Sequence, residues 1–349
     1  MKGLKAALVV LLGALVVFGL GGTVFAFHDG GVAECAGCHT MHNSVGGTAV
    51  APGGASYLLI AATPTEVCLS CHSGYGQMTA DGSGWRAGGD YYWLTKTFSW
   101  ESHGHTATSD GDRHGHNVVA PTLGINADVT LTMAPGGTYQ STDLGCNSCH
   151  DPHGEQGNVL LLYGAEDTYP SSFAFTAGVP AMISAGRKNN VSNTRHSVYN
   201  RGMSDWCVNC HTGFDSGIQK HVVDTAINSD MRNAYNAYVS TDNNTGNVNT
   251  AYWEIVPFEL NKTLTAADNT ASTTGMGSGA QVMCLSCHRA HASAFTSSGR
   301  WDFAVTEIAE SHPAAGDTNA MSWDVANKYY GYTFAGNQRS LCNKCHVKD

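Results

Sequence analysis

Hydrophobic residues form one long run near the start of the chain, from Ala6 to about Leu20, and are scattered along the remainder. The rest of the sequence is rich in Gly, Ser, Thr, Asn and Ala, as in 46–56 (GGTAVAPGGAS), 243–251 (NNTGNVNTA) and 267–281 (ADNTASTTGMGSGAQ). Such stretches are typical of turns and loops. The pattern therefore predicts a loop-rich chain with a few short helices and very little sheet.

Three segments are predicted to be helical, at 284–295 (CLSCHRAHASAF), 230–240 (DMRNAYNAYVS) and 301–312 (WDFAVTEIAESH). The hydrophobic segment at 158–163 (NVLLLY) fits either a short strand or a packed loop. A chain this rich in loops would normally bury too little apolar surface to offset the entropy lost on ordering. Something other than the polypeptide is therefore expected to complete the core.

The N-terminal hydrophobic run predicts a cleaved signal peptide over residues 1–26. Lys2 and Lys5 flank its start, and VFA at 24–26 ends it with residues that a signal peptidase accepts. A run of about 20 apolar residues could alternatively remain as a membrane anchor. We favour cleavage, which would start the mature chain at Phe27 and leave a single domain over 27–349, with no other stretch apolar enough to span a membrane.

All 12 cysteines lie in Cys-x-x-Cys pairs, and a histidine directly follows each pair. Zinc sites, thioredoxin-like redox pairs and disulfides also use paired cysteines, but none of them explains a histidine after every pair. Cys-x-x-Cys-His is the signature of covalent c-type haem attachment, in which the cysteines form thioethers and the histidine binds the iron. The six motifs are Cys35, Cys38 and His39; Cys68, Cys71 and His72; Cys146, Cys149 and His150; Cys207, Cys210 and His211; Cys284, Cys287 and His288; and Cys342, Cys345 and His346.

These motifs are spread along the whole mature chain and leave no haem-free segment large enough for a second domain. We therefore expect a multihaem cytochrome c: mostly loops and turns, with a few short helices and minimal sheet, wrapped around a linear chain of six haems. The apolar porphyrins would supply the missing core. Export is also expected, because c-type haem is attached outside the bacterial cytoplasm, and this agrees with the signal peptide.

The net charge of the mature chain bears on which kinds of partner it can bind. Loss of Lys2 and Lys5 with the signal peptide leaves 16 basic and 28 acidic side chains, a net charge of −12. Haem propionates would add further negative charge. An acidic surface argues against nucleic acid and anionic lipid as partners, and it would suit cationic or mineral ones.

Eleven histidines remain besides those of the motifs, and six haems with two imidazoles each would need six of them. Two imidazoles fill both axial positions of the iron, so such a haem carries electrons and offers no open position to a substrate. Methionine as sixth ligand would raise the reduction potential, but none of the 10 methionines lies in an evident ligand context. The sequence can therefore make every haem bis-histidine.

Three motifs carry a second histidine three residues after the first, in CAGCHTMH, CNSCHDPH and CLSCHRAH. These are His42, His153 and His291, which follow the first, third and fifth haem sites. His42 cannot reach the far face of its own haem, because His39 holds the chain on the near face. Each such loop is therefore expected to bind one iron and to direct a second imidazole at a neighbouring iron.

Spacing alone leaves the other three distal ligands open. The rivals include histidines of 102–116 (SHGHTATSDGDRHGH), a loop that could equally be solvated or bind a metal ion. His196 and His312 are expected to be surface residues. The candidates for these three distal ligands are His28, His116 and His221. Their rivals are His103, His105 and His114.

The stretch FHDGGVAECAGCHTMHNSVGG at 27–47 resembles the OmcS-type outer-surface hexahaem cytochromes of metal-reducing bacteria, which polymerise into conductive filaments. The likeness continues in GHNVVAPT, TLTMAPGGTY, CNSCHDPHG and GMSDWCVNCHT, and it ends in CLSCHRAHASAF and LCNKCHVKD. It covers all six haem sites and both termini, while the linkers between the third and fifth haems look shorter and diverge.

The resemblance implies which histidines are distal ligands, and it implies that the histidine matching His42 ligates the fifth haem of the next protomer, attached through Cys284 and Cys287. It also implies that haems stack alternately in parallel and T-shaped pairs. The five other spare histidines fall where the family pattern has none. The distal positions that match are His28, His42, His116, His153, His221 and His291.

Together these features predict a secreted or cell-surface homopolymer for long-range electron transfer to metal oxides, electrodes or partner cells. Haem motifs near both termini suit head-to-tail stacking, which gives open filaments when the rotation does not close. A monomeric periplasmic shuttle would use the same chemistry without assembly. A multihaem reductase needs an iron with an open position, often through a motif such as Cys-x-x-Cys-Lys, whereas all six motifs here end in histidine. We therefore expect an electron carrier and no catalytic residues.

Overall fold

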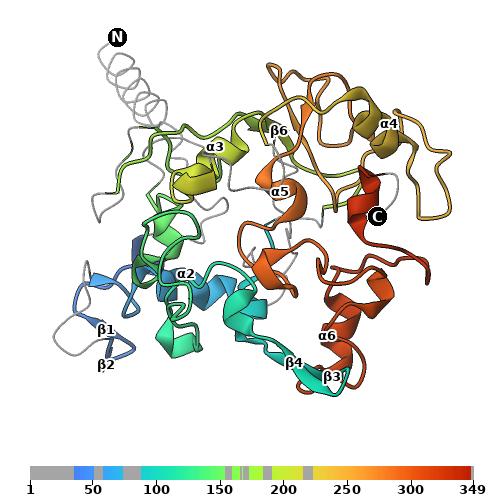
Figure 1. Ribbon diagram of the computed structural model, residues 1–349. Helices are drawn as coiled ribbons and strands as arrows, with labels where there is room; N and C mark the ends of the chain where they lie inside the picture. Colours follow the sequence, from blue (N-terminus) through green and yellow to red (C-terminus); the bar gives the residue numbers. More distant parts are fainter. Residues whose placement is uncertain are drawn as a thin grey trace, which may run out of the picture. The chain divides into compact units, whose positions relative to one another are not determined.

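The first haem motif lies in a different compact unit of the chain from the other five. The computed structural model describes residues 35–50, 58–73, 88–153, 159–165, 167, 173–183, 191–214 and 223–346 (Figure 1). The chain divides into residues 1–62 and residues 63–349. The predicted signal peptide, His28 and His221 lie outside the described residues, and a single domain over 27–349 stays a prediction.

The N-terminal unit holds the first motif on a single 3-10 turn, η1 (Cys35–Gly37), followed by the antiparallel strands β1 (Ser44–Val45) and β2 (Thr48–Ala49). Gly46 and Gly47 join the strands with positive φ angles of 57° and 82°. Two such residues make the turn whose twist suits a tight hairpin, and glycine adopts it without strain.

The larger unit has short helices separated by long irregular segments. Helix α2 begins after Thr63, whose side chain accepts the N–H of Glu66 at 3.1 Å, and α4 begins after Asn228, which caps Met231 at 2.9 Å. Such caps satisfy N–H groups that have no partner within the helix. The α-helices are α2 (Pro64–His72), α3 (Met203–Val208), α4 (Ser229–Ala237), α5 (Cys284–Cys287) and α6 (Ser322–Asn327).

Single 3-10 turns make up most of the remaining helical structure. They are η3 (Tyr91–Thr95), η4 (Gly111–Arg113), η5 (Pro121–Leu123), η6 (Ser141–Asp143), η7 (Cys146–Ser148), η8 (Val159–Leu161), η9 (Thr212–Phe214), η10 (Thr296–Ser298), η11 (Ile308–Glu310) and η12 (Leu341–Lys344).

Sheet is sparse among the described residues. Strands β3 (Phe98–Ser102) and β4 (His105–Ser109) form a hairpin, which lies beside the C-terminal region that carries α6 (Figure 1). A second sheet has the order β5-β6-β7-β8, with only β6 and β7 parallel. Its strands are β5 (Met182–Ile183), β6 (Val198–Asn200), β7 (Glu259–Leu260) and β8 (Ala280–Gln281).

The larger unit has an apolar core made by the polypeptide itself. Leu69 of α2, Trp93 of η3, Phe98 of β3, Tyr235 of α4 and Leu341 of η12 are buried in one hydrophobic cluster. The scattered hydrophobic pattern did not predict this core, because its members are far apart in the sequence and many are aromatic. Aromatic side chains bury a large area each, so few of them are needed.

The prediction of a few short helices and little sheet is confirmed among the described residues. The predicted bounds of individual helices need correction. Helix α4 lies within the predicted 230–240 segment apart from its first residue, but the helix predicted at 284–295 ends at Cys287, because His288 has extended backbone angles. The helix predicted at 301–312 is wrong except for the turn η11. Val159–Leu161 form the turn η8, and Leu162 and Tyr163 are buried, so the described part of 158–163 is a packed loop rather than a strand. Among the described residues, no helix is long and apolar enough to cross a membrane.

Candidate haem-binding sites

The first cysteine of every motif lies in a helical turn, and in five motifs a backbone hydrogen bond from the histidine closes that turn. The histidine N–H donates to the carbonyl of the first cysteine in five motifs, with distances from 2.8 Å at His39 to 3.1 Å at His211. The second motif occupies the end of α2. Residues i, i+3 and i+4 of a helical turn lie on the same side, so the two thiols and the imidazole face the same space. None of the 12 cysteines, all of which lie among the described residues, forms a disulfide.

Consecutive motifs of the larger unit are neighbours in space. The thiol of Cys68 is hydrogen-bonded to that of Cys146, which joins the second motif to the third through their first cysteines. Burial, followed by the neighbouring Cys210 thiol, raises the pKa of Cys149 to about 12, so the third and fourth motifs approach through their second cysteines. The contact therefore changes from first cysteines to second cysteines at the next junction.

The same alternation continues to the end of the chain. The thiols of Cys207 and Cys284 are hydrogen-bonded, which joins the fourth motif to the fifth. Burial and the nearby thiol of Cys345 raise the pKa of Cys287 to about 12, which marks the approach of the fifth motif to the sixth. The motifs from the second to the sixth thus follow one another in space in the order in which they occur in the sequence.

The motif histidines are held with one ring nitrogen available. Nδ1 of His150 is 2.8 Å from the carbonyl oxygen of Leu160, Nδ1 of His211 is 3.0 Å from that of Pro135, and Nδ1 of His288 is 2.7 Å from that of Ser297. A carbonyl oxygen can only accept, so Nδ1 carries the proton and Nε2 keeps its lone pair. This second hydrogen bond is the usual way in which a metal-binding histidine is oriented.

Two of the predicted distal histidines have the same arrangement. Nδ1 of His116 is 2.7 Å from the carbonyl oxygen of Ala290, and Nδ1 of His291 is 3.2 Å from that of Gly89. The two segments lie side by side, because the N–H of His116 also donates to the carbonyl of His291 at 2.9 Å. Both imidazoles are therefore fixed by backbone from distant parts of the chain.

Each of these distal imidazoles faces a motif imidazole across a gap. The ring centroids of His116 and His211 are 6.0 Å apart, and those of His150 and His291 are 6.3 Å apart. A metal–imidazole bond is about 2 Å long, and the ring centre lies about 1 Å further out, so two imidazoles on opposite sides of one iron have centres about 6 Å apart. Both pairs fit a bis-histidine iron.

The surroundings of His116 also fit a bound porphyrin. Its side chain is exposed, yet burial by the surrounding protein, followed by the nearby His211, lowers its pKa to about 4. A side chain that lines a hollow within the protein can be both accessible to solvent and surrounded by protein atoms. Burial, followed by His150, likewise lowers the pKa of His291 to about 3. At neutral pH these imidazoles are uncharged, which is the form that binds a metal.

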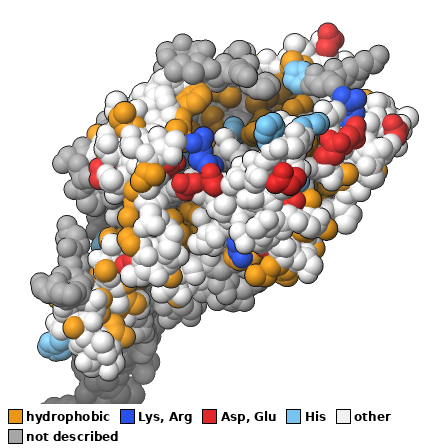
Figure 2. All heavy atoms as spheres, turned by 60° about the horizontal axis from the view of Figure 1, so that its bottom comes forward, with side chains coloured by type: hydrophobic (Ala, Val, Ile, Leu, Met, Phe, Trp, Pro, Cys, Tyr) orange, Lys and Arg blue, Asp and Glu red, His pale blue; other side chains and the backbone are white. Residues whose placement is uncertain are grey.

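A surface view agrees with this interpretation. On the face shown in Figure 2, several histidine side chains gather next to hydrophobic ones. The imidazoles of the larger unit lie close enough to change one another's pKa. His72 lowers the pKa of His150 and His291, and His211 and His288 lower the pKa of His116. The residues present therefore fit a row of haem groups with covalent and axial attachment.

The remaining predicted ligands are more exposed. His42 is exposed in the N-terminal unit, and His153 is exposed in the larger one, where its N–H donates to Asp151 at 3.0 Å.

Two spare histidines are structural. His114 is fully buried, and its ring nitrogens lie 3.0 Å from the Trp93 carbonyl and 2.7 Å from the Ser109 hydroxyl. His196 stacks on Tyr252 with ring centroids 3.5 Å apart, and its nitrogens are bonded to backbone carbonyls at 3.0 and 2.7 Å. Neither ring has a nitrogen free for iron.

The expectation that His196 and His312 lie on the surface is wrong. His196 is only 4% exposed, because it packs under Tyr252. His312 stacks on Trp100 and its Nδ1 lies 2.6 Å from Asp317, so it is partly covered. Among the described spare histidines that were not predicted as ligands, His103 in the β3–β4 turn and His105 at the start of β4 are exposed.

Sequence reasoning missed the glycines that allow these segments to approach one another. A Cβ on Gly89 would lie 1.7 Å from the Ala292 carbonyl oxygen, one on Gly115 would lie 2.1 Å from that of His291, and one on Gly137 would lie 1.9 Å from that of Cys210. The available signal was their position in the short glycine-containing stretches AGGD, HGH and APGGTY. Only glycine lets two backbones come this close.

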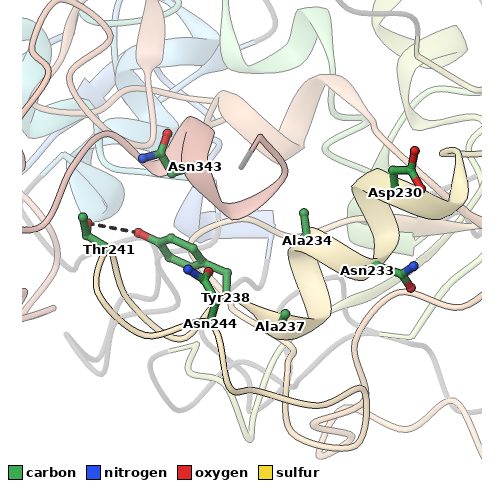
Figure 3. A pocket seen from close by; sticks show the side chains of 8 residues that line it. All are labelled: Asp230, Asn233, Ala234, Ala237, Tyr238, Thr241, Asn244 and Asn343. Carbon is green, nitrogen blue, oxygen red and sulfur yellow. Dashed lines mark hydrogen bonds between the residues drawn. The ribbon is translucent and has the colours of Figure 1, made fainter. Parts of the chain in front are cut away.

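A separate pocket lies beside the sixth motif. It is formed by α4, the segment that follows it, and Asn343 of η12 (Figure 3). No cysteine or histidine lines it, so it is not one of the haem sites. Its lining residues are Asp230, Asn233, Ala234, Ala237, Tyr238, Thr241, Asn244 and Asn343.

Comparison with known proteins gives the family. No family model matches the chain. Its sequence is 36% identical to C-type cytochrome OmcS of Geobacter sulfurreducens, and the match covers 100% of both sequences. The chain belongs to the OmcS family of c-type cytochromes. The resemblance found in the motifs is thereby confirmed.

Solved structures agree with this assignment. The chain matches a structure described as a cryo-EM of the OmcS nanowires from Geobacter sulfurreducens with a TM-score of 0.75 and 33% identity, covering 92% of this chain and 100% of that one. It matches an Outer Membrane Cytochrome S filament from the same organism with a TM-score of 0.73 and 32% identity, at the same coverage. As a c-type cytochrome, this member of the OmcS family carries electrons on covalently attached haem.

Proposed function

We propose that this protein carries electrons over long distances outside the cell, through six bis-histidine c-type haems in protomers that polymerise head to tail. The observation that carries the proposal is the unbroken succession of neighbouring motifs from the second to the sixth. Haems attached to adjoining motifs would lie close together, as electron transfer between them requires. The filaments formed by the two matching structures support the polymeric state.

The proposed ligand set uses every motif and six further histidines. The cysteine pairs would hold the porphyrins, the six motif histidines would bind one face of each iron, and iron would alternate between ferric and ferrous states. The imidazole distances support His211 with His116, and His150 with His291, as axial pairs. The distal ligands of the other haems would be His28, His42, His153 and His221.

The pairing of His291 with His150 supports an assignment for His42. His291 belongs to the fifth motif and faces the iron site of the third, so a Cys-x-x-Cys-His-x-x-His loop serves the site two motifs earlier. The printed sequence has no Cys-x-x-Cys-His motif before the first one. Its second histidine, His42, would therefore serve the fifth site of a neighbouring protomer, where Cys284, Cys287 and His288 hold the haem. The same bond would then join protomers.

The location and destination follow from the same features. A signal peptide over 1–26 would export the chain, and the acidic mature surface suits cationic or mineral acceptors. We propose a cell-surface or extracellular location and delivery of electrons to metal oxides, electrodes or partner cells. We propose no nucleic-acid partner.

Two other functions, a periplasmic shuttle and a reductase, have less support. A monomeric periplasmic shuttle would have the same haems, but the exposed His42 and the filaments of the matching structures favour assembly. A reductase needs an iron with an open position, and the two imidazole pairs instead favour closed, six-coordinate irons.

Electron microscopy and EPR of native material together test the proposal. We expect filaments, six haems per chain by mass spectrometry, and low-spin ferric signals for nearly all of the iron. Only small particles at every concentration would leave the shuttle as the better explanation. A large high-spin population in intact material would point to open iron sites and to the reductase.

A further inference from the structure

The sixth haem motif differs from the other five in the two residues between its cysteines. These residues are AG, LS, NS, VN and LS in the first five motifs and NK in the sixth. The sixth motif is therefore the only one that carries a charged side chain inside its Cys-x-x-Cys unit. This side chain belongs to Lys344, the last residue of η12, and it comes directly before Cys345.

Lys344 is buried and its side chain turns into the protein. The residue is 2% exposed, whereas lysines are almost never fully buried unless their polar end has a partner. Its Nζ donates to the carbonyl of Tyr238 at 2.8 Å, and this hydrogen bond lies in the interior. Tyr238 is the residue that caps the C-terminus of α4, where free carbonyl oxygens favour a cation. The ammonium is thus bonded to the end of a helix.

Three aromatic rings surround the same ammonium group. Its Nζ lies 4.3 Å from the ring centroid of Tyr235, 5.5 Å from that of Trp253 and 5.8 Å from that of Tyr238. A cation within about 6 Å of a ring centroid is attracted by the negative face of the ring. We call these three residues the aromatic cage. A charged ammonium is the form of the lysine that such a cage stabilises.

The aromatic cage is itself held in place by hydrogen bonds. Tyr235 is 0% exposed, its hydroxyl donates to the carbonyl of Val256 at 2.9 Å, and the same hydroxyl accepts the N–H of Trp253 at 3.1 Å. The side-chain amide of Gln338 donates to the hydroxyl of Tyr238. The position of the charge is therefore fixed relative to η12.

The surroundings of the charge are apolar. Tyr235 belongs to the buried hydrophobic cluster of the larger unit, and Trp253, Cys342 and Cys345 pack against that cluster. In such surroundings the effective dielectric constant is lower than in water, and a charge acts more strongly on its neighbours. A haem attached through Cys342 and Cys345 would lie next to this cation.

We propose that Lys344 acts as a fixed buried cation that raises the reduction potential of the haem attached at the sixth motif. This rests on the proposed function, because it requires haem at Cys342 and Cys345. When an electron arrives from the fifth haem, the ferric iron of the sixth becomes ferrous. Lys344 keeps its proton throughout, and no bond forms or breaks.

Electrostatics gives the direction of the effect. A ferric site has one more positive charge than a ferrous one, so a nearby cation destabilises the ferric form more and favours reduction. Removal of the charge should therefore lower the potential of this one haem. The sixth motif ends the succession of neighbouring motifs, so Lys344 would determine how strongly an electron is held at that end of the row.

Spectroelectrochemical titration of the intact haem-loaded protein at pH 6 tests the proposal. At this pH the ammonium stays protonated, although burial lowers the pKa of Lys344 to about 8. In Lys344→Met, one haem's share of the absorbance change should move to a lower potential and the remainder should stay in place. Lys344→Arg keeps the cation and should keep the wild-type titration. An arginine variant that shifts as far as the methionine variant would assign the effect to packing and overturn the proposal.

Lys262→Met is the matched control, because it removes the same charge from a side chain that is 50% exposed and lies 2.6 Å from Asp268. Solvent and salt screen a charge at such a position, so its titration should be unchanged. Mass spectrometry and EPR establish that each variant has six low-spin haems.

A Lys344→Met protein with six low-spin haems and the wild-type titration overturns the proposal and leaves the proposed function intact. Wild-type protein with fewer haems or much high-spin iron would instead contradict the proposed function. If Lys344→Met does not load six haems, Lys344→Gln is judged by the same shift. Failure of both neutral variants to load haem would give Lys344 a structural role and overturn the proposal.

Discussion

At the scale of the residue, the contacts of the second ring nitrogen separate a histidine that we propose as a ligand from one that packs. Nδ1 of His291 lies 3.2 Å from the Gly89 carbonyl oxygen, and its ring centroid is 6.3 Å from that of His150. His196 has both nitrogens close to carbonyl oxygens and one face covered by Tyr252. The sequence shows only that both are histidines.

Replacing His291 with Ala should therefore change the spin state of one haem. The imidazole opposite His150 would be lost, the third haem would have a vacant or weakly filled sixth position, and a high-spin ferric signal would appear. EPR on the purified variant measures this signal, with mass spectrometry to show that all haems remain attached. A fully low-spin spectrum would contradict the pairing.

His196→Ala is the contrast, because it removes an imidazole that packs inside the protein. It should leave the EPR spectrum unchanged and lower the free energy of unfolding by about 1–3 kcal/mol, since a buried carbonyl oxygen loses its hydrogen-bond donor. Chemical denaturation followed by fluorescence measures the loss. A new high-spin signal in this variant would show that His196 is a ligand after all.

At the scale of the element, glycine positions decide how closely loops approach the haem motifs. The Cβ of an alanine at position 137 would lie 1.9 Å from the carbonyl oxygen of Cys210, so the loop or the fourth motif would have to move. We expect Gly137→Ala to lower the free energy of unfolding by about 1–3 kcal/mol, as in other overpacked sites. It should also shift the spectrum of one haem, because Pro135 in the same loop orients His211.

Gly277→Ala is the control for this prediction, because no atom lies within 4 Å of the Cβ it would add. Denaturation midpoints and visible spectra of the two variants can be compared directly. Equal stability of the two would mean that the 134–139 loop is free to move away from Cys210.

The elements also show how far the sequence could predict the fold. The motif spacing predicts six haem sites, because covalent attachment depends on a local pattern that sequence displays directly. Helix lengths were overestimated because local side chains end them: Asp302 accepts the N–H of Ala304 at 2.9 Å and turns the chain where a helix was expected. The motif histidines opposite His116 and His291 could not be derived from spacing, because they lie far away in the sequence and come close only through tertiary packing.

At the scale of the whole molecule, stability is expected to depend on haem. The larger unit has an apolar core of its own, but the ring centroids of His116 and His291 lie 6.0 and 6.3 Å from those of His211 and His150, and an iron porphyrin would fill the space between the rings of each pair. An empty hollow loses the contacts of its lining. A chain produced without haem attachment should therefore lose cooperative unfolding and become sensitive to protease, while the attached form resists.

Near-ultraviolet circular dichroism and limited proteolysis of the two forms measure this dependence. The control is the haem-loaded protein at the same concentration and ionic strength, because binding that favours the folded state shifts apparent stability by mass action. A haem-free chain with sharp, cooperative unfolding would show that the aromatic core around Trp93 and Tyr235 is sufficient by itself.

Assembly is the property of the whole molecule that depends most directly on a single side chain. His42 is exposed, and the step of two motifs seen for His291 leaves it without a target in its own chain. His42→Ala should keep six covalent haems, prevent or shorten filaments, and convert one haem per protomer to a high-spin or weakly ligated state. Negative-stain microscopy and EPR on the same preparation measure both effects, and His103→Ala, which removes an exposed histidine from the β3–β4 turn, should change neither. Loss of filaments with a fully low-spin spectrum would make His42 an ordinary contact residue. Intact filaments with a low-spin spectrum would remove it from the interface, and the fifth haem would then take its distal ligand from its own protomer.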